Sequence, residues 1–399
     1  MKVLICTEGY YPNISGVITH IETLKSCLEA DGHETMVVCT LAGRLWHELR
    51  GGILYSPGIR LKRIYGYGLA QPISHKRMRL VRRFHPDIVH IHTEFSQGLF
   101  GQHVAKKLRI PLVYTMHTFY DDYVSYITGP RYEATARKAA CRYTRYFADH
   151  ATEVIVPSPK IANYLLSAGY QGECTLVPNT VMAEQFKPEN VDPEKVERLK
   201  KRMGIAENDI CLCYVGRLGQ EKSNDILIEH FAKGFGGEDR YKLFIIGDGP
   251  LRQRLEAMVS ARRISGQVFL LGAIDHALLP TYYQCFSIFT TASLSEVHSI
   301  SLIEAQVSGL YAINRLDVPN RHQIMEGITG EHFETAEDFE RSVRGYGEKT
   351  AGERAENRRM ISAIACRYGP EQFAALVKKI YRKAQRQPRV PVYRDVAHK

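Results

Sequence analysis

Residues 210–222 read ICLCYVGRLGQEK, an apolar strand pattern that runs directly into a glycine-flanked loop with two cations. A helical pattern begins just after the loop, near Asp225. Further short apolar runs lie at 242–246, 268–271, 287–290 and 310–313. Strand and helix signals that alternate in this way indicate a parallel sheet with helices on both faces.

The amino-terminal half shows the same alternation. Residues 2–6 predict a buried strand, residues 18–30 have helical spacing, and residues 34–40 predict a second strand. Further short apolar runs lie at 88–91, 112–114, 154–156 and 175–177. The expected fold class is therefore α/β, with two Rossmann-like, doubly wound domains that face each other across a cleft. A ligand is expected at the carboxyl ends of the strands.

Length and one charged stretch divide the chain. Its 399 residues exceed the ~250–300 residues at which a single core stops growing. Residues 188–207 are charged and have no strand signal, which places the junction within 178–205. We expect domains at 1–180 and 181–370. At 371–399 we expect an amphipathic helix and a tail that pack back toward the first domain.

Composition excludes several classes of protein. The chain is 44% apolar and 24% charged, as is typical of soluble globular proteins, and no apolar run reaches the ~18–20 residues of a membrane span. The first six residues indicate a strand and not a signal peptide. The nine cysteines are scattered without a CxxC pair, so neither a zinc site nor a disulfide framework is expected. We expect a cytoplasmic protein, peripheral on the inner face of the cell membrane.

The net charge of +10 is concentrated in one part of the chain. Residues 51–150 hold 16 Lys and Arg against six Asp and Glu, which indicates an anionic partner. Residues 74–84 have a helical pattern with cations at Lys76, Arg77, Arg79, Arg82 and Arg83. Such a helix can lie on anionic lipid, at ~1 kcal/mol per cation. A solvated basic face is the alternative; nucleic acid is not expected, because no nucleic-acid-binding motif accompanies the helix.

Three segments of the second half carry residues suited to a nucleotide sugar. Arg217 and Lys222 project from a strand-to-helix loop, where two cations beside a helix N-terminus suit a diphosphate. A solvated loop with a salt bridge to Glu221 is the alternative. Gly247 closes the next strand in a GDGP turn, where a glycine lets the backbone approach a ligand. This turn is not a GxGxxG fingerprint, so no nicotinamide or flavin cofactor is expected.

The third segment contains two carboxylates. Glu296 lies in a loop, and Glu304 lies one or two turns into an apolar helix. A nucleotide sugar needs acceptors for its ribose and hexose hydroxyls, and donors for its pyrophosphate. The backbone at the helix start supplies such donors, at Ser299, Ile300 and Ser301. The alternative is an acid favoured by the helix dipole, together with a second Glu that is satisfied elsewhere.

Together, GRLxxEK, GDGP and ExxxxxxxE, each after a strand and in this order, resemble the retaining family 4 glycosyltransferases of the glycosyltransferase B fold. By this resemblance, Arg217 and Lys222 hold the donor diphosphate. Glu304 binds the ribose and Glu296 binds the transferred hexose. The likeness covers about residues 1–340. It implies a sugar-nucleotide substrate, with no cofactor and no required metal.

The first half resembles the same family. Residues 10–17 look like its first loop, where the backbone of Gly16 approaches the sugar and phosphate, and residues 86–92, PDIVHIH, look like one of its strands. His117, in YTMHT, matches the active-site histidine of the family, which implies contact with the transferred hexose. A packed or surface histidine is the alternative.

A narrower likeness concerns the acceptor. Residues 117–127, HTFYDDYVSYI, resemble a segment of bacterial 1,2-diacylglycerol 3-glucosyltransferases. Two acids among aromatic residues could orient an acceptor hydroxyl beside an apolar chain. The residues concerned are Tyr120, Asp121, Asp122 and Tyr123. An aromatic core helix with capping acids is the alternative.

The sequence thus predicts a retaining hexosyltransferase that moves glucose from UDP-glucose to the hydroxyl of diacylglycerol or a related lipid. Its expected partners are the sugar nucleotide, the lipid and an anionic membrane surface. Two alternatives stay open: a polysaccharide, polyprenyl-linked or small soluble acceptor, and a non-catalytic binding subunit. The second is motivated by His298 and Ser299, which stand where the family usually has an aromatic residue and a glycine. Asn179-Thr180 and Leu310-Tyr311 also depart from the family pattern.

Overall fold

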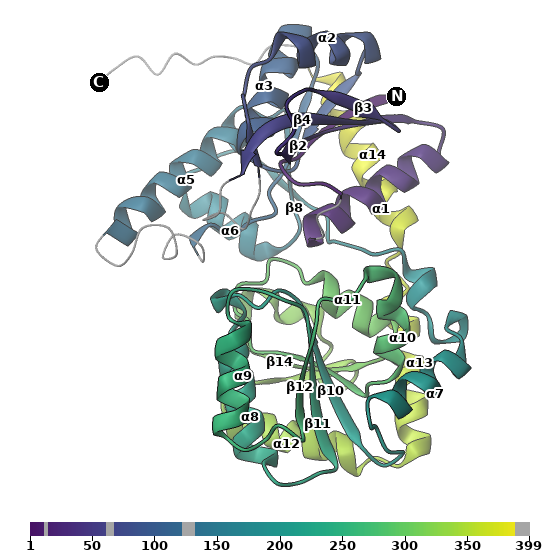
Figure 1. The fold of residues 1–399 in the computed structure, drawn as a ribbon. Coiled ribbons are helices and arrows are strands. Elements are labelled where there is room, and N and C mark those ends of the chain that lie inside the picture. The colour runs from purple at the N-terminus through teal and green to yellow at the C-terminus, as the bar shows by residue number, and fades with distance from the viewer. Residues whose placement is uncertain (12–14, 61–67, 122–131, 388–399) are drawn as a thin grey trace. The chain divides into compact units, whose positions relative to one another are not determined.

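The computed structural model describes residues 1–11, 15–60, 68–121 and 132–387 (Figure 1). The chain forms two compact units. The first unit contains Met1–Asn179 and Pro370–Lys399, and the second contains Thr180–Gly369. Each unit is built on its own, largely parallel sheet, as the alternation of strand and helix signals predicted.

The sheet of the first unit has the strand order β3-β4-β2-β1-β6-β7-β8-β9, with β5 paired to β4. Pairing is parallel except at β3–β4 and β4–β5. The strands are β1 (Lys2–Cys6), β2 (Glu34–Ala42), β3 (Glu48–Arg50), β4 (Ile53–Arg60), β5 (Gly68–Ala70), β6 (Ile88–Ile91), β7 (Leu112–Thr115), β8 (Glu153–Val156) and β9 (Cys174–Leu176). Parallel strands covered on both faces are buried, and β6, β7 and β8 are buried along their whole length.

Two helices of the first unit, α1 and α2, begin at serine caps that the sequence carries. The side chain of Ser15 accepts from the backbone of Ile18 at the start of α1, and Ser74 does the same for Arg77 at the start of α2. The helices are α1 (Gly16–Ala30), α2 (His75–Phe84), α3 (Ser96–Leu108), α5 (Glu133–Asp149), α6 (Pro159–Ser167) and α14 (Pro370–Arg386). The carboxy-terminal helix α14 packs against α1 and β7, with Phe373, Val377 and Tyr381 buried.

Strands β3, β4 and β5 form an antiparallel extension of the sheet, for which the sequence gives no strand signal. The reason is local: β3 and β5 have three residues each, and β4 contains Pro57 and Gly58, which are depleted in strands. Gly58 is required here because a Cβ would lie 2.9 Å from the carbonyl oxygen of Leu69. The close approach of two backbones therefore explains the glycine.

The second unit has a six-stranded parallel sheet in the order β12-β11-β10-β13-β14-β15. The strands are β10 (Ile210–Val215), β11 (Tyr241–Ile246), β12 (Val268–Gly272), β13 (Ile288–Thr291), β14 (Tyr311–Arg315) and β15 (Gly330–Phe333). The helices are α7 (Pro193–Arg202), α8 (Asn224–Phe235), α9 (Arg252–Ala261), α10 (Leu279–Gln284), α11 (Ile300–Val307), α12 (Ala336–Glu348) and α13 (Ala351–Ala365). The charged stretch before β10 thus contains a helix, α7, which is capped by Asp192.

Alternate residues of β10 face two separate hydrophobic clusters. Leu212 and Tyr214 pack with residues of α8, α9 and α12, whereas Cys211 and Cys213 pack with residues of α7, α10 and α11. Figure 1 shows these two groups of helices on opposite faces of the sheet. The two cysteines therefore act as small hydrophobic side chains.

Candidate active site

The strand order of the second unit brings two loops to one point on the edge of its sheet. From β10 the chain moves outward through β11 to β12, and it then returns to the other side of β10 with β13. Open α/β sheets bind ligands at such a switch point, beyond the carboxyl ends of the strands. The loop after β10 carries Arg217 and Lys222, and the loop after β13 carries Glu296.

Lys222 and Glu296 meet across this switch point. The Nζ atom of Lys222 lies 2.5 Å from Oε1 of Glu296, and both side chains are partly exposed. Nδ2 of Asn320 donates to the backbone oxygen of Glu296 at 2.5 Å and to Asp317 Oδ2 at 2.9 Å. The loop after β14 therefore supports the position of Glu296, a role that no local motif announces.

Arg217 is anchored beside the same loop. Its guanidinium pairs with the carboxylate of Glu221, whose side chain is buried. Oγ of Ser293 donates to the backbone oxygen of Glu221 at 3.4 Å. The salt bridge from Arg217 to Glu221 that the loop pattern suggested is thus present. It fixes the guanidinium at the edge of the sheet, with its side chain still 30% exposed.

Gly247 and Gly216 lie where two backbones come together. Gly247 has φ +138°, and a Cβ on it would lie 1.8 Å from the carbonyl oxygen of Gly216. The backbone N–H of Leu218 donates to the oxygen of Asp248 at 2.9 Å, which ties the GDGP turn to the GRLGQEK loop. Packing between the two loops is therefore sufficient reason for a glycine at 247. Contact between Gly247 and a donor remains a prediction.

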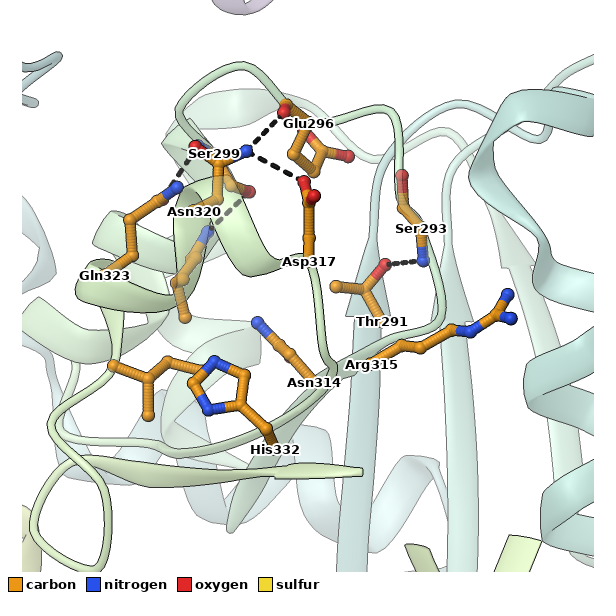
Figure 2. A pocket seen from close by; sticks show the side chains of 12 residues that line it. Thr291, Ser293, Glu296, Ser299, Asn314, Arg315, Asp317, Asn320, Gln323 and His332 are labelled. Carbon is orange, nitrogen blue, oxygen red and sulfur yellow. Dashed lines mark hydrogen bonds between the residues drawn. The ribbon is translucent and has the colours of Figure 1, made fainter. Parts of the chain in front are cut away.

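A pocket opens at the N-terminus of α11 (Figure 2). Glu296, Ser299, Asn314, Asn320 and Gln323 are among the residues that line it. Ser299 is the N-cap of α11: its Oγ accepts from the backbone of Leu302 at 3.3 Å, and its own N–H donates to Oε1 of Gln323 at 3.0 Å. Ile300 and Ser301 follow in the first turn, where backbone N–H groups lack intrahelical acceptors.

The replacement of a glycine by Ser299 causes no backbone strain. Its φ of −70° and ψ of 113° are open to any L-residue. The departure at this position therefore leaves the start of α11 regular, with its cap formed.

Two buried amide oxygens in this pocket were not found from the sequence. Within the described part of the chain, Oδ1 of Asn314 and Oδ1 of Asn320 have no hydrogen-bond partner. An unpaired buried acceptor costs free energy that a ligand hydroxyl can recover. The available signal was weak: Asn314 lies one residue before the end of β14, and Asn320 lies in the loop that follows.

Glu304 lies apart from the contacts that hold Glu296. Its side chain is nearly buried on α11, with Oε1 2.7 Å from Nε2 of His276 and Oε2 3.1 Å from the hydroxyl of Tyr283. The hydrogen bond with Glu304 raises the pKa of His276 above its usual value. The second acid is thus satisfied, as the alternative interpretation required. A role in ribose binding remains a prediction.

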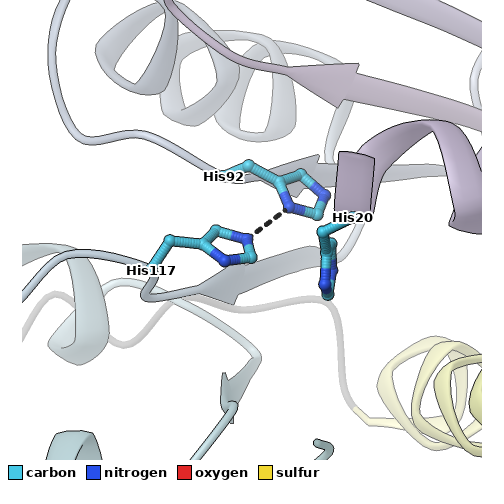
Figure 3. Close-up of side chains that lie close together, drawn as sticks. All are labelled: His20, His92 and His117. Atoms are coloured by element: carbon cyan, nitrogen blue, oxygen red, sulfur yellow. Dashed lines mark hydrogen bonds between the residues drawn. The ribbon is translucent and has the colours of Figure 1, made fainter. Parts of the chain in front are cut away.

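In the first unit, His117 joins a cluster with His92 and His20 (Figure 3). His117 follows β7, His92 follows β6 and His20 lies on α1. Nδ1 of His92 lies 2.9 Å from Nε2 of His117. Burial, followed by the neighbouring His20 and His90, holds the pKa of His117 well below its usual value. His117 is therefore a neutral, half-buried imidazole at physiological pH.

The expected acceptor residues are placed only in part. The hydroxyl of Tyr120 donates to Oε2 of Glu94, and Asp121 lies 3.5 Å from Arg137. Burial raises the pKa of Asp121. Asp122 and Tyr123 lie outside the described residues. Gly16 is the first residue of α1, next to the N-cap Ser15.

Glu94 is a further residue that the sequence analysis missed. Its buried carboxylate accepts from Tyr114 at 2.6 Å as well as from Tyr120, and its backbone oxygen accepts from Tyr143 at 2.6 Å. Burial raises the pKa of Glu94. Glu94 therefore holds the start of the expected acceptor segment to the end of β6.

The structure corrects one residue of the expected membrane surface. Arg77 is 0% exposed, and its guanidinium lies 3.9 Å from the centre of the Phe100 ring. Its Nη2 donates to the backbone oxygens of Gln71 at 2.5 Å and Pro72 at 2.9 Å. The prediction that Arg77 contacts lipid is wrong, because the face of α2 that carries it packs inward. Lys76, Arg79, Arg82 and Arg83 are exposed on the same helix.

Among the described residues, no helix is both long and apolar enough to cross a bilayer.

Two Rossmann-like units, with paired cations and an acid at the switch point of one sheet, define a nucleotide-sugar-dependent glycosyltransferase. The family model described as "Glycosyltransferase Family 4" matches residues 14–185, and the one described as "Glycosyl transferases group 1" matches residues 195–363. The chain belongs to family 4 of the glycosyltransferases, as its motifs predicted.

Known relatives and solved structures agree with this assignment. The chain is 32% identical to an alpha-monoglucosyldiacylglycerol synthase of Acholeplasma laidlawii over 85% of this chain and 86% of the relative. It is 29% identical to the enzyme of the same name from Streptococcus pneumoniae, over 77% and 70% of the two chains. The structure of Anabaena HepE in complex with UDP and glucose matches with a TM-score of 0.72 and 16% identity, over 95% of this chain and 99% of that one. This last likeness shows the glycosyltransferase B fold.

Proposed function

We propose that the protein transfers glucose from UDP-glucose to the free hydroxyl of diacylglycerol, with retention at the anomeric carbon. Similarity to two alpha-monoglucosyldiacylglycerol synthases supports both the sugar and the acceptor. Glucose is α-linked in UDP-glucose, so an α-linked product implies retention. The observation that carries the donor chemistry is the pairing of Lys222 with Glu296 at the switch point of the second sheet.

The leaving diphosphate is stabilised by positive groups at one edge of this sheet. Arg217 and Lys222 come from the loop after β10, and the first turn of α11 supplies backbone N–H groups. Negative charge that develops on a leaving phosphate is stabilised most effectively by cations and N–H donors that are already in position. Arg217 is held in this way by Glu221.

The transferred sugar is positioned by Glu296 and His117. The carboxylate of Glu296 accepts hydrogen bonds from hydroxyl groups of the hexose. The neutral imidazole of His117 forms a hydrogen bond with another hydroxyl. The bond between the anomeric carbon and the β-phosphate oxygen breaks, and its electron pair goes to the phosphate. The acceptor oxygen then bonds to the same face of the carbon, and its proton passes to the departing phosphate.

No divalent ion is needed in this scheme, because Arg217 and Lys222 provide the charge that a metal would bring. This part of the proposal predicts full transfer after treatment with EDTA. Loss of transfer in EDTA that Mg²⁺ restores would contradict it.

The acceptor is reached from a membrane surface that the first unit contacts. The exposed cations of α2 attract anionic lipid, and apolar side chains lie near the start of this helix: Leu45 is 86% exposed and Trp46 is 58% exposed. Nε2 of His47 lies 3.0 Å from Oγ of Ser74, the N-cap of α2, so this loop and the helix start are joined. Together they form a cationic and apolar surface suited to the inner, anionic face of the cell membrane.

The test is incubation of purified protein with anionic liposomes that contain diacylglycerol and one of UDP-glucose, UDP-galactose, UDP-N-acetylglucosamine or GDP-mannose. We expect a glucosylated lipid from UDP-glucose, with an α linkage by NMR. No glycolipid from any donor would reject the lipid acceptor and favour a polyprenyl-linked or soluble one. Cellular function that survives Arg217→Ala would instead favour a non-catalytic binding subunit.

A further inference from the structure

Three histidines converge in the first unit, near the carboxyl ends of its central strands. One ring nitrogen each from His20, His92 and His117 lies within 4.8 Å of the other two, and Figure 3 shows the rings gathered together. The ring centres of His20 and His117 are 4.5 Å apart. We propose that these three imidazoles form a binding site for one divalent transition-metal ion, and that the ion inhibits the enzyme.

His20 presents a lone pair that has no partner in the part of the chain that the structure describes. Its Nδ1 lies 2.9 Å from Oδ1 of Asn179. An amide oxygen can only accept, so Nδ1 carries the proton and Nε2 is bare. Nε2 of His20 is buried and has no hydrogen-bond partner among the described residues. Metal-binding histidines in proteins usually donate one N–H to an oxygen, which orients the ring and leaves the other nitrogen for the ion, as at His20.

His92 and His117 share one proton between two nitrogens. Nδ1 of His92 lies 2.9 Å from Nε2 of His117, and Nε2 of His92 is buried without a partner in the described part of the chain. When a metal ion takes the place of the shared proton, each ring keeps one N–H on the nitrogen that faces away from the ion, Nε2 of His92 and Nδ1 of His117, so that both rings stay neutral. Burial lowers the pKa of His20 to about 4 and holds those of His92 and His117 well below the usual value. The rings are therefore uncharged at neutral pH, as ligation requires.

The ligand set selects the kind of ion. Three imidazoles suit Zn²⁺, Cu²⁺, Ni²⁺ and Co²⁺, whereas Mg²⁺ and Ca²⁺ prefer oxygen ligands. Zn–N bonds of about 2.0–2.1 Å put tetrahedral ligand nitrogens roughly 3.3 Å apart. Side-chain shifts on the order of 1 Å would close the cluster to this spacing. The fourth position is left for water, as in sites with three protein ligands.

Inhibition follows from the place of His117, and this step rests on the proposed function. An ion held by His117 removes the imidazole from the hexose and blocks its approach. This ion is therefore distinct from a metal that would assist the donor diphosphate. The structure assigns it to the first unit, whereas Arg217 and Lys222 belong to the second.

The test uses the full chain after removal of metals with EDTA and desalting. We expect one Co²⁺ per chain, with the strong visible absorption of tetrahedral coordination and without the near-ultraviolet band of thiolate ligands. This spectrum separates the site from the nine cysteines. Zn²⁺ should displace Co²⁺ and raise the thermal unfolding midpoint, because it binds the folded state.

Variants separate the cluster from other histidines. His20→Gln and His117→Gln should each abolish the Co²⁺ spectrum, while His103→Gln, on α3, should leave it unchanged. Far-ultraviolet circular dichroism shows whether each variant folds, and half-buried His117 is the safer of the two changes. An unchanged spectrum in both folded variants, a thiolate band, or no binding at 100-fold excess Co²⁺ would overturn the site.

Activity then tests the inhibitory role separately. Zn²⁺ should lower the transfer of glucose with the same midpoint as site occupancy, and whatever activity His20→Gln retains should be insensitive to Zn²⁺. Occupancy without inhibition would leave the metal site established and would contradict both its inhibitory role and the role proposed for His117. An inactive protein that still gives the Co²⁺ spectrum would contradict the proposed function alone.

Discussion

The ammonium of Lys222 lies 2.5 Å from the carboxylate of Glu296, and this contact joins the loop after β10 to the loop after β13. A diphosphate that binds Lys222 competes with Glu296 for the same charge. We therefore expect donor binding to release the carboxylate of Glu296 toward the hexose hydroxyls. In this way we expect the pair to couple the binding of the donor's phosphate end to the binding of its sugar end.

Replacement of Lys222 by alanine should lower the rate of glucose transfer by about 10²-fold or more, because a preorganised positive group is lost from the leaving phosphate. Lys222→Ala also removes this partner of Glu296, so Glu296→Gln alone and the double variant complete a double-mutant cycle that separates the two effects. The measurement is radiolabelled glucose in the lipid extract under saturating donor.

Lys233→Ala is the matched control, because Lys233 makes an exposed ion pair with Glu337 in the same unit. Its activity should equal that of the unchanged protein. A rate within threefold of normal for Lys222→Ala would show that Lys222 does not hold the diphosphate.

Glu8 should make the protein less stable as the pH rises from 5 to 8. Burial raises the pKa of Glu8 from 4.5 to about 7. Between these values the folded state holds a proton that the unfolded state has lost. The contribution of Glu8 to the free energy of unfolding therefore falls by up to roughly 3 kcal/mol as the pH rises through this window. Above the window this contribution no longer changes with pH. Glu8→Gln should remove this part of the pH dependence.

The amide in Glu8→Gln can keep the local hydrogen bonds. Its oxygen can accept from the backbone of Gln97, and the hydroxyls of Ser96 and Thr40, which now donate to the carboxylate, can rotate to accept. Thermal unfolding at pH 5 and pH 8 measures the effect, with exposed Glu34→Gln as the control. Equal pH dependence in Glu8→Gln and the unchanged protein would refute the assignment.

Arg77 should contribute to stability and not to lipid binding. Arg77→Met keeps the length of the side chain but loses two hydrogen bonds to backbone oxygens and the contact with Phe100. We expect a loss of about 2–3 kcal/mol in the free energy of unfolding. Urea denaturation measures this loss, and vesicle sedimentation should be unchanged. As a control, Arg79→Met, two residues away and exposed, should keep full stability. Weaker co-sedimentation of folded Arg77→Met with vesicles would instead show that Arg77 contributes to membrane binding.

Trp46 should report contact with the membrane directly, since it is the single tryptophan of the chain. Its emission should shift to shorter wavelength with anionic vesicles and not with neutral ones, because the exposed indole enters a less polar layer. Charge reversal of Lys76, Arg79, Arg82 and Arg83 together should weaken partition by at least roughly 10³-fold, because the loss of four cations alone removes ~1 kcal/mol each.

Four exposed cations of α7 provide a control of equal charge. Reversal of Lys195, Arg198, Lys201 and Arg202 should leave the fluorescence titration unchanged. Equal losses in the two quadruple variants would mean that net charge, and not the surface at α2, governs binding. A fluorescence shift with anionic vesicles that is lost in the α2 variant and kept in the α7 variant would fit the proposed surface.

Most helices and strands, and the family, could be predicted from the amino-acid sequence alone. Short apolar strands punctuated by glycine, and helices begun by Ser15 and Ser74, are local properties, because backbone preference and capping involve residues only a few positions apart. The donor motifs are likewise short, and their order along the chain was enough to predict two Rossmann-like domains and a glycosyltransferase. The extension β3 to β5 was not predicted. Strands β3 and β5 are too short to show a local pattern, and β4 contains Pro57 and Gly58, which are unusual in strands.

Which of these residues contact one another could be seen only in the tertiary structure. Helical spacing placed Arg77 among five cations, but the packing of α2 buried it and left the other four exposed. Lys222 and Glu296 meet because β13 pairs beside β10, and His20, His92 and His117 meet because β6 and β7 are adjacent and α1 lies near their ends. Periodicity states which residues share a face, whereas strand pairing and packing, which act between distant parts of the chain, decide what that face meets.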